Sequence, residues 1–289
     1  MEESERIVHS NNIYRSSAGE ATLRAWCEER IASFDCSHRR SSIQTTLGRT
    51  EVLEAGAGDR TVVLLPGTNF ATATWLDLVE DLGIRYRVIA LDIPGQPGLS
   101  SSNRPSGPDA YPRWLVETLR VLRVESPILV GHSLGARVAL AAAGDSPEIG
   151  GLALISPAGI IRLRVSPAIL VRAMVWLARR DESSSAALVR MMTTQEAPPE
   201  LVEWMTLVGQ IVRTSFAPSP LPDSVLARVD VPCVILVGSH DVFLPSLRVA
   251  ARVAEWLPVA VLEVVPGAGH LLPHERPDAL EAALRRVFG

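Results

Sequence analysis

An apolar run that ends in a Gly-x-Ser-x-Gly pattern most constrains how this chain can fold. Residues 127–136 read Pro-Ile-Leu-Val-Gly-His-Ser-Leu-Gly-Ala, and a second apolar stretch with helical spacing follows them. This order predicts a short strand, a tight turn and a helix. Gly131 and Gly135 are small enough to let the strand and the helix pass close together, so Ser133 would be exposed at the carboxyl end of the strand. The backbone N–H of Leu134, at the start of the helix, would favour negative charge beside that serine.

From residue 61 onward, short apolar runs alternate with amphipathic helical patterns. Such alternation predicts an α/β fold with a mostly parallel sheet and helices on both of its faces. The expected strands lie at residues 61–65, 87–92, 127–130, 151–155, 233–237 and 261–265, and the expected helices near residues 75–82, 111–122, 134–143, 247–256 and 277–287.

The amino-terminal part of the chain differs from this pattern. Residues 1–35 are expected to form an extension with one helix, because its apolar residues recur at helical spacing: Leu23, Trp26, Cys27, Ile31 and Phe34. Residues 37–54, with a turn at 47–50, predict an antiparallel hairpin. With 289 residues, the whole chain, 1–289, is expected to form a single α/β domain.

Residues 157–222 interrupt the alternation, because they carry helical patterns without a β-branched run between them. We expect a helical cap inserted between two strands of the sheet, and we call these residues the cap segment. Every methionine except the initiator falls in it: Met174, Met191, Met192 and Met205. They could line an adaptable binding site or simply form the small core of the insertion. Its arginines could contact an acidic substrate, or they could be the solvated face of a helix.

Composition excludes several classes of protein. A formal net charge of -4 and a pI near 5.9, without a basic cluster, give no reason to expect nucleic acid. All basic residues are arginines, so no lysine can form a Schiff base with a carbonyl substrate or pyridoxal phosphate. Three cysteines, Cys27, Cys36 and Cys233, have no metal-like spacing and are expected to be reduced thiols. No metal, organic cofactor or membrane span is expected, and the acidic amino terminus favours a cytoplasmic location.

A serine hydroxyl becomes a good nucleophile only when an imidazole removes its proton, and a carboxylate usually orients that imidazole. Asp241 follows the predicted strand 233–237, and His270 follows the last predicted strand. Since the carboxyl ends of parallel strands share one edge of the sheet, Ser133, Asp241 and His270 are candidates for a catalytic triad. Alternatively, Asp241 could only cap a helix, and His270 could be a satisfied loop residue with His274 as its rival.

A second backbone donor is expected beside the serine. The loop Pro66-Gly67-Thr68-Asn69 follows the first parallel strand, and its glycine allows the loop to turn towards Ser133. The N–H groups of Thr68 and Leu134 are the candidates for an oxyanion hole. The N–H of Asn69 is the alternative to that of Thr68, and a plain strand-to-helix turn remains possible.

Together these motifs resemble the α/β-hydrolase superfamily, most closely its bacterial serine carboxylesterases. The resemblance rests on residues 65–68 with Trp75, on residues 92–100, and on the segments 131–135, 238–241 and 267–270. The chain departs from the superfamily pattern at Pro66-Gly67, because His-Gly is commoner at this place in the superfamily. Serine at position 133 argues against a dehalogenase or an epoxide hydrolase, whose members would carry aspartate there.

The resemblance implies a serine hydrolase that cleaves small to medium uncharged carboxylic esters through an acyl-enzyme intermediate. Its expected partner is a small-molecule ester. Alternatives are a lactonase, thioesterase, carbon–carbon bond hydrolase or perhydrolase, or a ligand-binding module without catalysis. The residues expected to contact the substrate are Asn69, Met174, Met192, Trp204 and Phe243.

Overall fold

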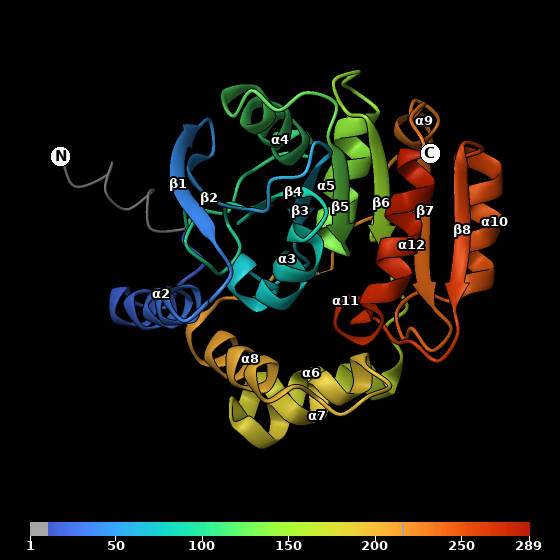
Figure 1. The fold of residues 1–289 in the computed structure, drawn as a ribbon. Helices are drawn as coiled ribbons and strands as arrows, with labels where there is room; N and C mark the ends of the chain where they lie inside the picture. Colours follow the sequence, from blue (N-terminus) through green and yellow to red (C-terminus); the bar gives the residue numbers. More distant parts are fainter. Residues whose placement is uncertain (1–10, 216) are drawn as a thin grey trace.

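An eight-stranded sheet forms the centre of the protein in a computed structural model that describes residues 11–215 and 217–289. Its spatial order is β1-β2-β4-β3-β5-β6-β7-β8 (Figure 1). β1 and β2 form an antiparallel hairpin, and β2 pairs antiparallel with β4; the remaining pairs are parallel. The strands are β1 (His38–Thr45), β2 (Gly48–Ala55), β3 (Thr61–Leu65), β4 (Arg87–Leu91), β5 (Ile128–His132), β6 (Gly151–Ile155), β7 (Cys233–Gly238) and β8 (Ala260–Val265).

Alternating side chains of the central strands face two separate apolar cores. In β3, Val62 and Leu64 belong to one core, and Val63 and Leu65 belong to the other. Each core must be covered, because a parallel sheet of apolar strands cannot face water. One face carries α3 (Leu76–Gly83) and α12 (Pro277–Phe288), and the other carries α4 (Ala110–Val121), α5 (Leu134–Ala143) and α10 (Ser246–Trp256). The predicted mostly parallel sheet, with an amino-terminal hairpin and helices on both faces, is confirmed.

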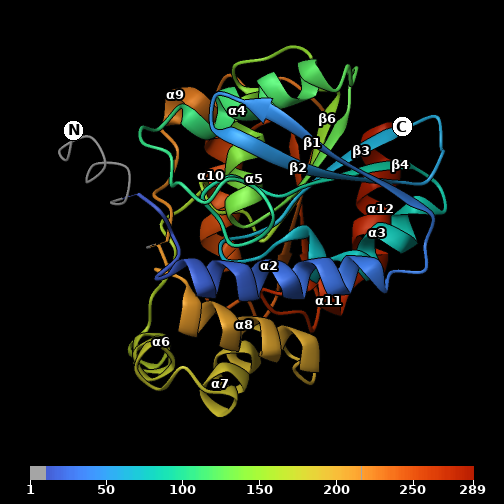
Figure 2. The same cartoon turned by 90° about the vertical axis from the view of Figure 1, so that its left-hand side faces the viewer.

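The amino-terminal helix α2 (Ser17–Ala32) crosses the molecule between the strands above it and the helices of the cap segment below it (Figure 2). The Ser16 hydroxyl accepts a hydrogen bond from the N–H of Gly19 and so caps the first turn. Leu23, Cys27 and Ile31 recur every four residues and are buried, and the helix packs on α8 of the cap segment. This contact joins the amino-terminal part of the chain to a segment far away in the sequence.

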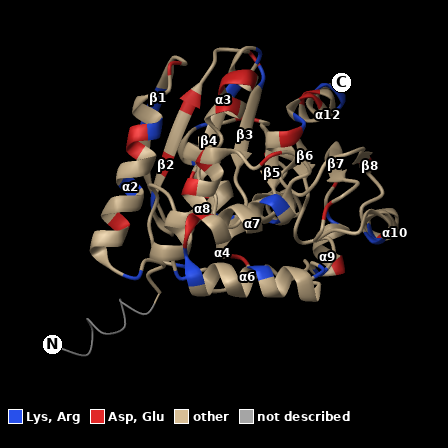
Figure 3. Ribbon diagram, turned by 90° about the horizontal axis from the view of Figure 1, so that it is seen from below, with Lys and Arg blue, Asp and Glu red and all other residues tan. Residues whose placement is uncertain are grey.

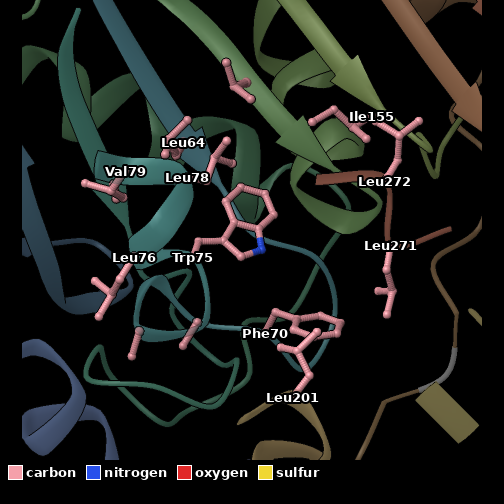
Figure 4. Close-up of a cluster of buried hydrophobic side chains, with 14 of the residues drawn as sticks. Leu64, Phe70, Trp75, Leu76, Leu78, Val79, Ile155, Leu201, Leu271 and Leu272 are labelled. Carbon is pink, nitrogen blue, oxygen red and sulfur yellow. The ribbon is translucent and has the colours of Figure 1, made fainter. Parts of the chain in front are cut away.

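The described residues of the cap segment form helices and no strand. Its helices lie between β6 and β7 in the chain and beyond the carboxyl ends of the parallel strands (Figure 1). Asp181 begins the second of them with a capping box shared with Ser184. Leu201 points towards Phe70 and joins the core of the first sheet face (Figure 4). The helices of the cap segment are α6 (Pro167–Arg179), α7 (Glu182–Met192) and α8 (Pro199–Ile211). The short α9 (Asp223–Leu226) follows the segment and lies at the opposite end of the sheet (Figure 1).

Two short elements complete the fold, η1 (Thr72–Thr74) and α11 (Leu272–Glu275). Cys27 and Cys233 are buried, and both are free thiols, as is Cys36. Within residues 11–215 and 217–289, no helix has both the length and the apolar character needed to cross a bilayer.

Candidate active site

Ser133 occupies a strained turn between β5 and α5. Its backbone has φ 47° and ψ -105°, in the region that side chains other than glycine rarely adopt. The flanking glycines are required, since a Cβ on Gly131 would lie 2.5 Å from the Ala136 nitrogen, and one on Gly135 would lie 2.0 Å from the Leu65 oxygen. The turn therefore brings Ser133 to the carboxyl end of the central strand, with the amino terminus of α5 directly behind it.

Asp241 and His270 meet at the same edge of the sheet. The Nδ1 atom of His270 lies 2.8 Å from Oδ2 of Asp241, and both side chains are almost completely buried. The other carboxylate oxygen of Asp241 accepts hydrogen bonds from the backbone N–H groups of Phe243 and Leu244, at 2.9 and 3.1 Å. Burial raises the pKa of Asp241, but the attraction between Asp241 and His270 and the hydrogen bonds from His270 and from the N–H of Phe243 outweigh this effect, so the pKa of Asp241 lies below its ordinary value. Asp241 is thus an anion that fixes the ring of His270.

The loop that carries His270 is attached to the cap segment. The backbone N–H groups of His270 and Leu271 both donate to the carbonyl oxygen of Met192, at 2.7 and 3.0 Å. Glu275 is buried, and its Oε2 accepts from the N–H of Gly269 and from the hydroxyl of Thr194, at 2.9 and 2.8 Å. The position of His270 therefore depends on the end of α7 as well as on β8.

Glu275 was not expected in the site from the sequence. The sequence pattern that could have indicated it is an acidic residue shortly after His270, beyond the apolar residues Leu271 and Leu272.

His132, directly before Ser133, is also in contact with the histidine loop. Its Nε2 lies 2.9 Å from the backbone oxygen of His270, and since that oxygen can only accept, Nε2 carries the proton. Burial lowers the pKa of His132 to about 3, so its ring is neutral. Its Nδ1 approaches Gly67, where a Cβ would lie only 2.7 Å away. From the sequence, no role was expected for His132 beyond its place in the Gly-x-Ser-x-Gly pattern.

The loop after β3 forms a tight turn beside Ser133. The N–H of Phe70 donates to the Gly67 oxygen at 3.1 Å, and Asn69 has φ 66°. The N–H of Asn69 is already bound to Oε1 of Gln96 at 3.0 Å. For the N–H of Thr68, no acceptor is present among the residues that the structure describes. Of the N–H groups of Thr68 and Asn69, the geometry therefore favours that of Thr68 as the donor for an oxyanion.

A cavity of about 270 Å³ opens at these residues. Ser133, His270 and Thr68 contribute to its wall. The rest of its lining is mostly apolar and comes largely from the cap segment and from Phe70 and Phe243: Leu163, Val165, Ile169, Ala173, Trp176, Leu188, Met192, Met205, Ala217 and Pro218. A smaller cavity of about 230 Å³ adjoins it at Thr68 and is lined by Leu134, Arg104 and Arg137.

Of the residues expected to contact the substrate, Asn69, Met192 and Phe243 line the larger cavity. Met174 does not, because Ile169, Ala173 and Trp176 form the inner side of α6, whereas Met174 is 61% exposed on the outer side. Trp204 does not line it either. Its ring is buried, and its N–H donates to the Asn69 oxygen at 2.7 Å, so it supports the turn from behind.

In the described part of the chain, no group of three or more His, Cys, Asp or Glu side chains is arranged so that it could hold a metal ion.

The model of the alpha/beta hydrolase family matches residues 62–283, which span the sheet, Ser133, Asp241 and His270. The chain belongs to this family. It is 26% identical over 271 residues to an uncharacterized carboxylesterase, nap, of Bacillus subtilis, and the match covers 85% of each chain. It is 24% identical over 249 residues to the carboxylesterase YbfK of the same organism, covering 82% of this chain and 83% of the relative.

Solved structures have the same fold. The crystal structure of naproxen esterase from Bacillus subtilis superimposes with a TM-score of 0.82 at 24% identity, covering 95% of this chain and 100% of the other. Bacterial carboxylesterases are thus among the proteins that resemble this chain both in sequence and in fold.

Proposed function

We propose that the protein is a serine esterase in which Ser133 is the nucleophile, His270 the general base and Asp241 the residue that orients His270. The observation that carries the proposal is the 2.8 Å contact between His270 Nδ1 and Asp241 Oδ2, at a cavity that Ser133 also lines. With Nδ1 bound to the carboxylate, Nε2 of His270 has a lone pair for the serine proton. The carboxylesterases among the relatives support ester hydrolysis.

In acylation, Oγ of Ser133 forms a bond to the carbonyl carbon while its proton passes to Nε2 of His270. The N–H groups of Thr68 and Leu134 donate to the oxyanion of the tetrahedral intermediate. The carbon–oxygen bond to the alcohol then breaks, and the alcohol takes the proton from His270. In deacylation, water replaces the alcohol and the same steps release the carboxylic acid and free Ser133.

Small to medium uncharged esters are the proposed substrates, and the cap segment is proposed to select among them. Support comes from the lining of the cavity, which is mostly apolar and includes Ile169, Trp176, Leu188 and Met192 of the cap. An apolar acyl group gains free energy when it leaves water for such a surface. None of the described residues that line the cavity carries a carboxylate, so nothing among them favours a cationic substrate.

A fluorophosphonate probe tests the assignment of the nucleophile, because it reacts with an activated serine and forms a stable adduct. We expect one adduct per chain, located at Ser133 by peptide mass mapping, and neither labelling nor ester turnover in Ser133→Ala. Ser183→Ala, which removes an exposed hydroxyl from α7, is the matched control and should behave as the wild type. An adduct at another serine, or turnover by Ser133→Ala, would show that the assignment is wrong.

A further inference from the structure

The outer side of α6 is an exposed apolar surface. Two apolar side chains of this helix are buried, Ile169 and Trp176, yet its other sides are also apolar. A helix that is apolar on all sides is normally covered on all sides. We call the exposed apolar residues of this helix, together with Val165 just before it, the α6 patch. Each has between 37% and 61% of its surface accessible: Val165, Leu170, Val171, Met174, Val175 and Leu177.

The charged side chains within residues 162–180 are all cationic, and the acidic residues Asp181 and Glu182 follow directly after this segment. Residues 162–180 contain arginine at positions 162, 164, 172, 179 and 180, and no aspartate or glutamate. Arg179 pairs with Asp181 at 2.9 Å, whereas Arg162, Arg164 and Arg172 form no ion pair within the described part of the chain. In Figure 3, α6 is drawn mostly in the colour of uncharged residues. This local positive charge contrasts with the net charge of -4 of the whole chain.

We infer that the α6 patch binds the surface of a lipid bilayer that contains anionic lipids. Apolar side chains on one side of a helix can enter the boundary between headgroups and acyl chains, while arginines at its edge contact lipid phosphates. A second copy of the chain is a poorer occupant. Two copies that met at this patch around a two-fold axis would bring together Arg162, Arg164 and Arg172 of each copy, and the neighbouring carboxylate of Asp181 is already paired with Arg179.

The α6 patch is continuous with the proposed substrate cavity. Val165 is 56% exposed and also lines the cavity, and Ile169 lines it from the inner side of the same helix. A bilayer bound to the patch would therefore lie beside the cavity, and esters dissolved in the lipid could enter without crossing much water. Binding of the bilayer does not depend on the proposed hydrolysis, so the two can be tested separately.

The test is sedimentation of the full-length protein with vesicles. We expect binding to vesicles of phosphatidylcholine with 30% phosphatidylglycerol, and weaker binding to pure phosphatidylcholine. Leu170→Gln/Val171→Gln should lower the partition coefficient roughly tenfold or more, because two apolar side chains no longer enter the lipid. Arg162→Gln/Arg172→Gln should lower the partition coefficient about 25-fold on anionic vesicles, since each arginine contributes about a fivefold factor there, with little change on pure phosphatidylcholine.

Leu247→Gln is the matched control, because Leu247 is 85% exposed on α10 and lies outside the cap segment. It should bind vesicles as the wild type does, and the thermal unfolding midpoints of all variants should show that they are folded. Three results would overturn the inference: no binding by the wild type, an equal loss of binding in Leu247→Gln, or a wild-type dimer that Leu170→Gln/Val171→Gln converts to a monomer in sedimentation velocity.

Discussion

The ring of His132 donates its Nε2 proton to the backbone oxygen of His270, 2.9 Å away. The residue before the candidate nucleophile thus contacts the residue proposed to be its general base. This bond limits the movement of the His270 backbone, while Asp241 limits the movement of its ring. Because the pKa of His132 is lowered to about 3, this donor stays in the same protonation state at neutral pH.

From this contact we expect His132→Leu to lower kcat for a p-nitrophenyl ester about tenfold, which corresponds to the loss of one hydrogen bond. KM should change much less, because the lost bond holds the backbone of His270 and is not a contact with the ester. His132→Gln retains a donor near the position of Nε2 and should recover part of the loss. Equal losses in the two variants would mean that the volume of the ring matters and its hydrogen bond does not.

Two buried histidines predict how stability depends on pH. Burial lowers the pKa of His132 to about 3 and that of His274 to about 4, from an ordinary value of 6.5. At a pH between the lowered pKa of each ring and 6.5, the unfolded state binds protons that the folded state does not. The folded state is therefore most stable above pH 6.5 and loses stability as the pH falls below this value. At pH 5 the loss is about 2 kcal/mol for each ring.

Urea unfolding at pH 7.5 and pH 5.0 measures this loss. For the wild type, the free energy of unfolding should be lower at pH 5.0 than at pH 7.5. In His274→Gln this decrease should be smaller by about 2 kcal/mol. His240→Gln, which replaces an exposed histidine, should fall as much as the wild type. If His274→Gln is as sensitive to pH as the wild type, His274 takes up a proton in the folded state.

If Asp241 orients His270 and His270 is the general base, substitutions of Asp241, His270 and His274 should have different effects. Asp241→Asn should keep the fold, because the remaining oxygen can still accept from Phe243 and Leu244, but kcat should fall by about 10⁴-fold. His270→Ala should have no measurable turnover, whereas His274→Ala should retain most of it. Steady-state kinetics with circular dichroism as the folding control decide this, and an inactive His274→Ala beside an active His270→Ala would refute the assignment.

The sequence predicted the strands and the position of Ser133 because those features depend on local patterns. A β-branched run, a glycine at each required position and an apolar helix are all visible within residues 127–143. The meeting of Asp241 with His270 could also be anticipated, since both follow parallel strands that end at one edge.

The sequence could not predict which side of α6 faces the cavity. This helix has apolar residues on all sides, so its periodicity does not distinguish Met174, which is exposed, from Ile169, which is buried. The role of Trp204 was missed for a related reason: its indole N–H binds a backbone oxygen of a distant loop, and no local pattern encodes that contact. Glu275 likewise acts through residues 81 positions away in the chain.

The volume of the apolar cavity should decide which acyl chain length the proposed esterase prefers. Each CH₂ of an acyl chain that enters the apolar cavity contributes about 0.8 kcal/mol, so kcat/KM should rise about fourfold per carbon from acetyl esters upwards. The rise should stop and reverse once the chain fills the cavity, whose volume is about 270 Å³. A series of p-nitrophenyl esters of increasing acyl length measures this profile.

Met192→Ala should move the optimum to longer acyl chains, because it removes volume from the cavity wall. Met191→Ala is the matched control: Met191 is the preceding residue of α7 but does not line the cavity, so the optimum should stay in place. A flat profile in the wild type would show that the acyl group does not enter this cavity. A preference for acyl groups with a carboxylate would instead point to the adjoining cavity at Arg104 and Arg137, where a guanidinium could bind the anion.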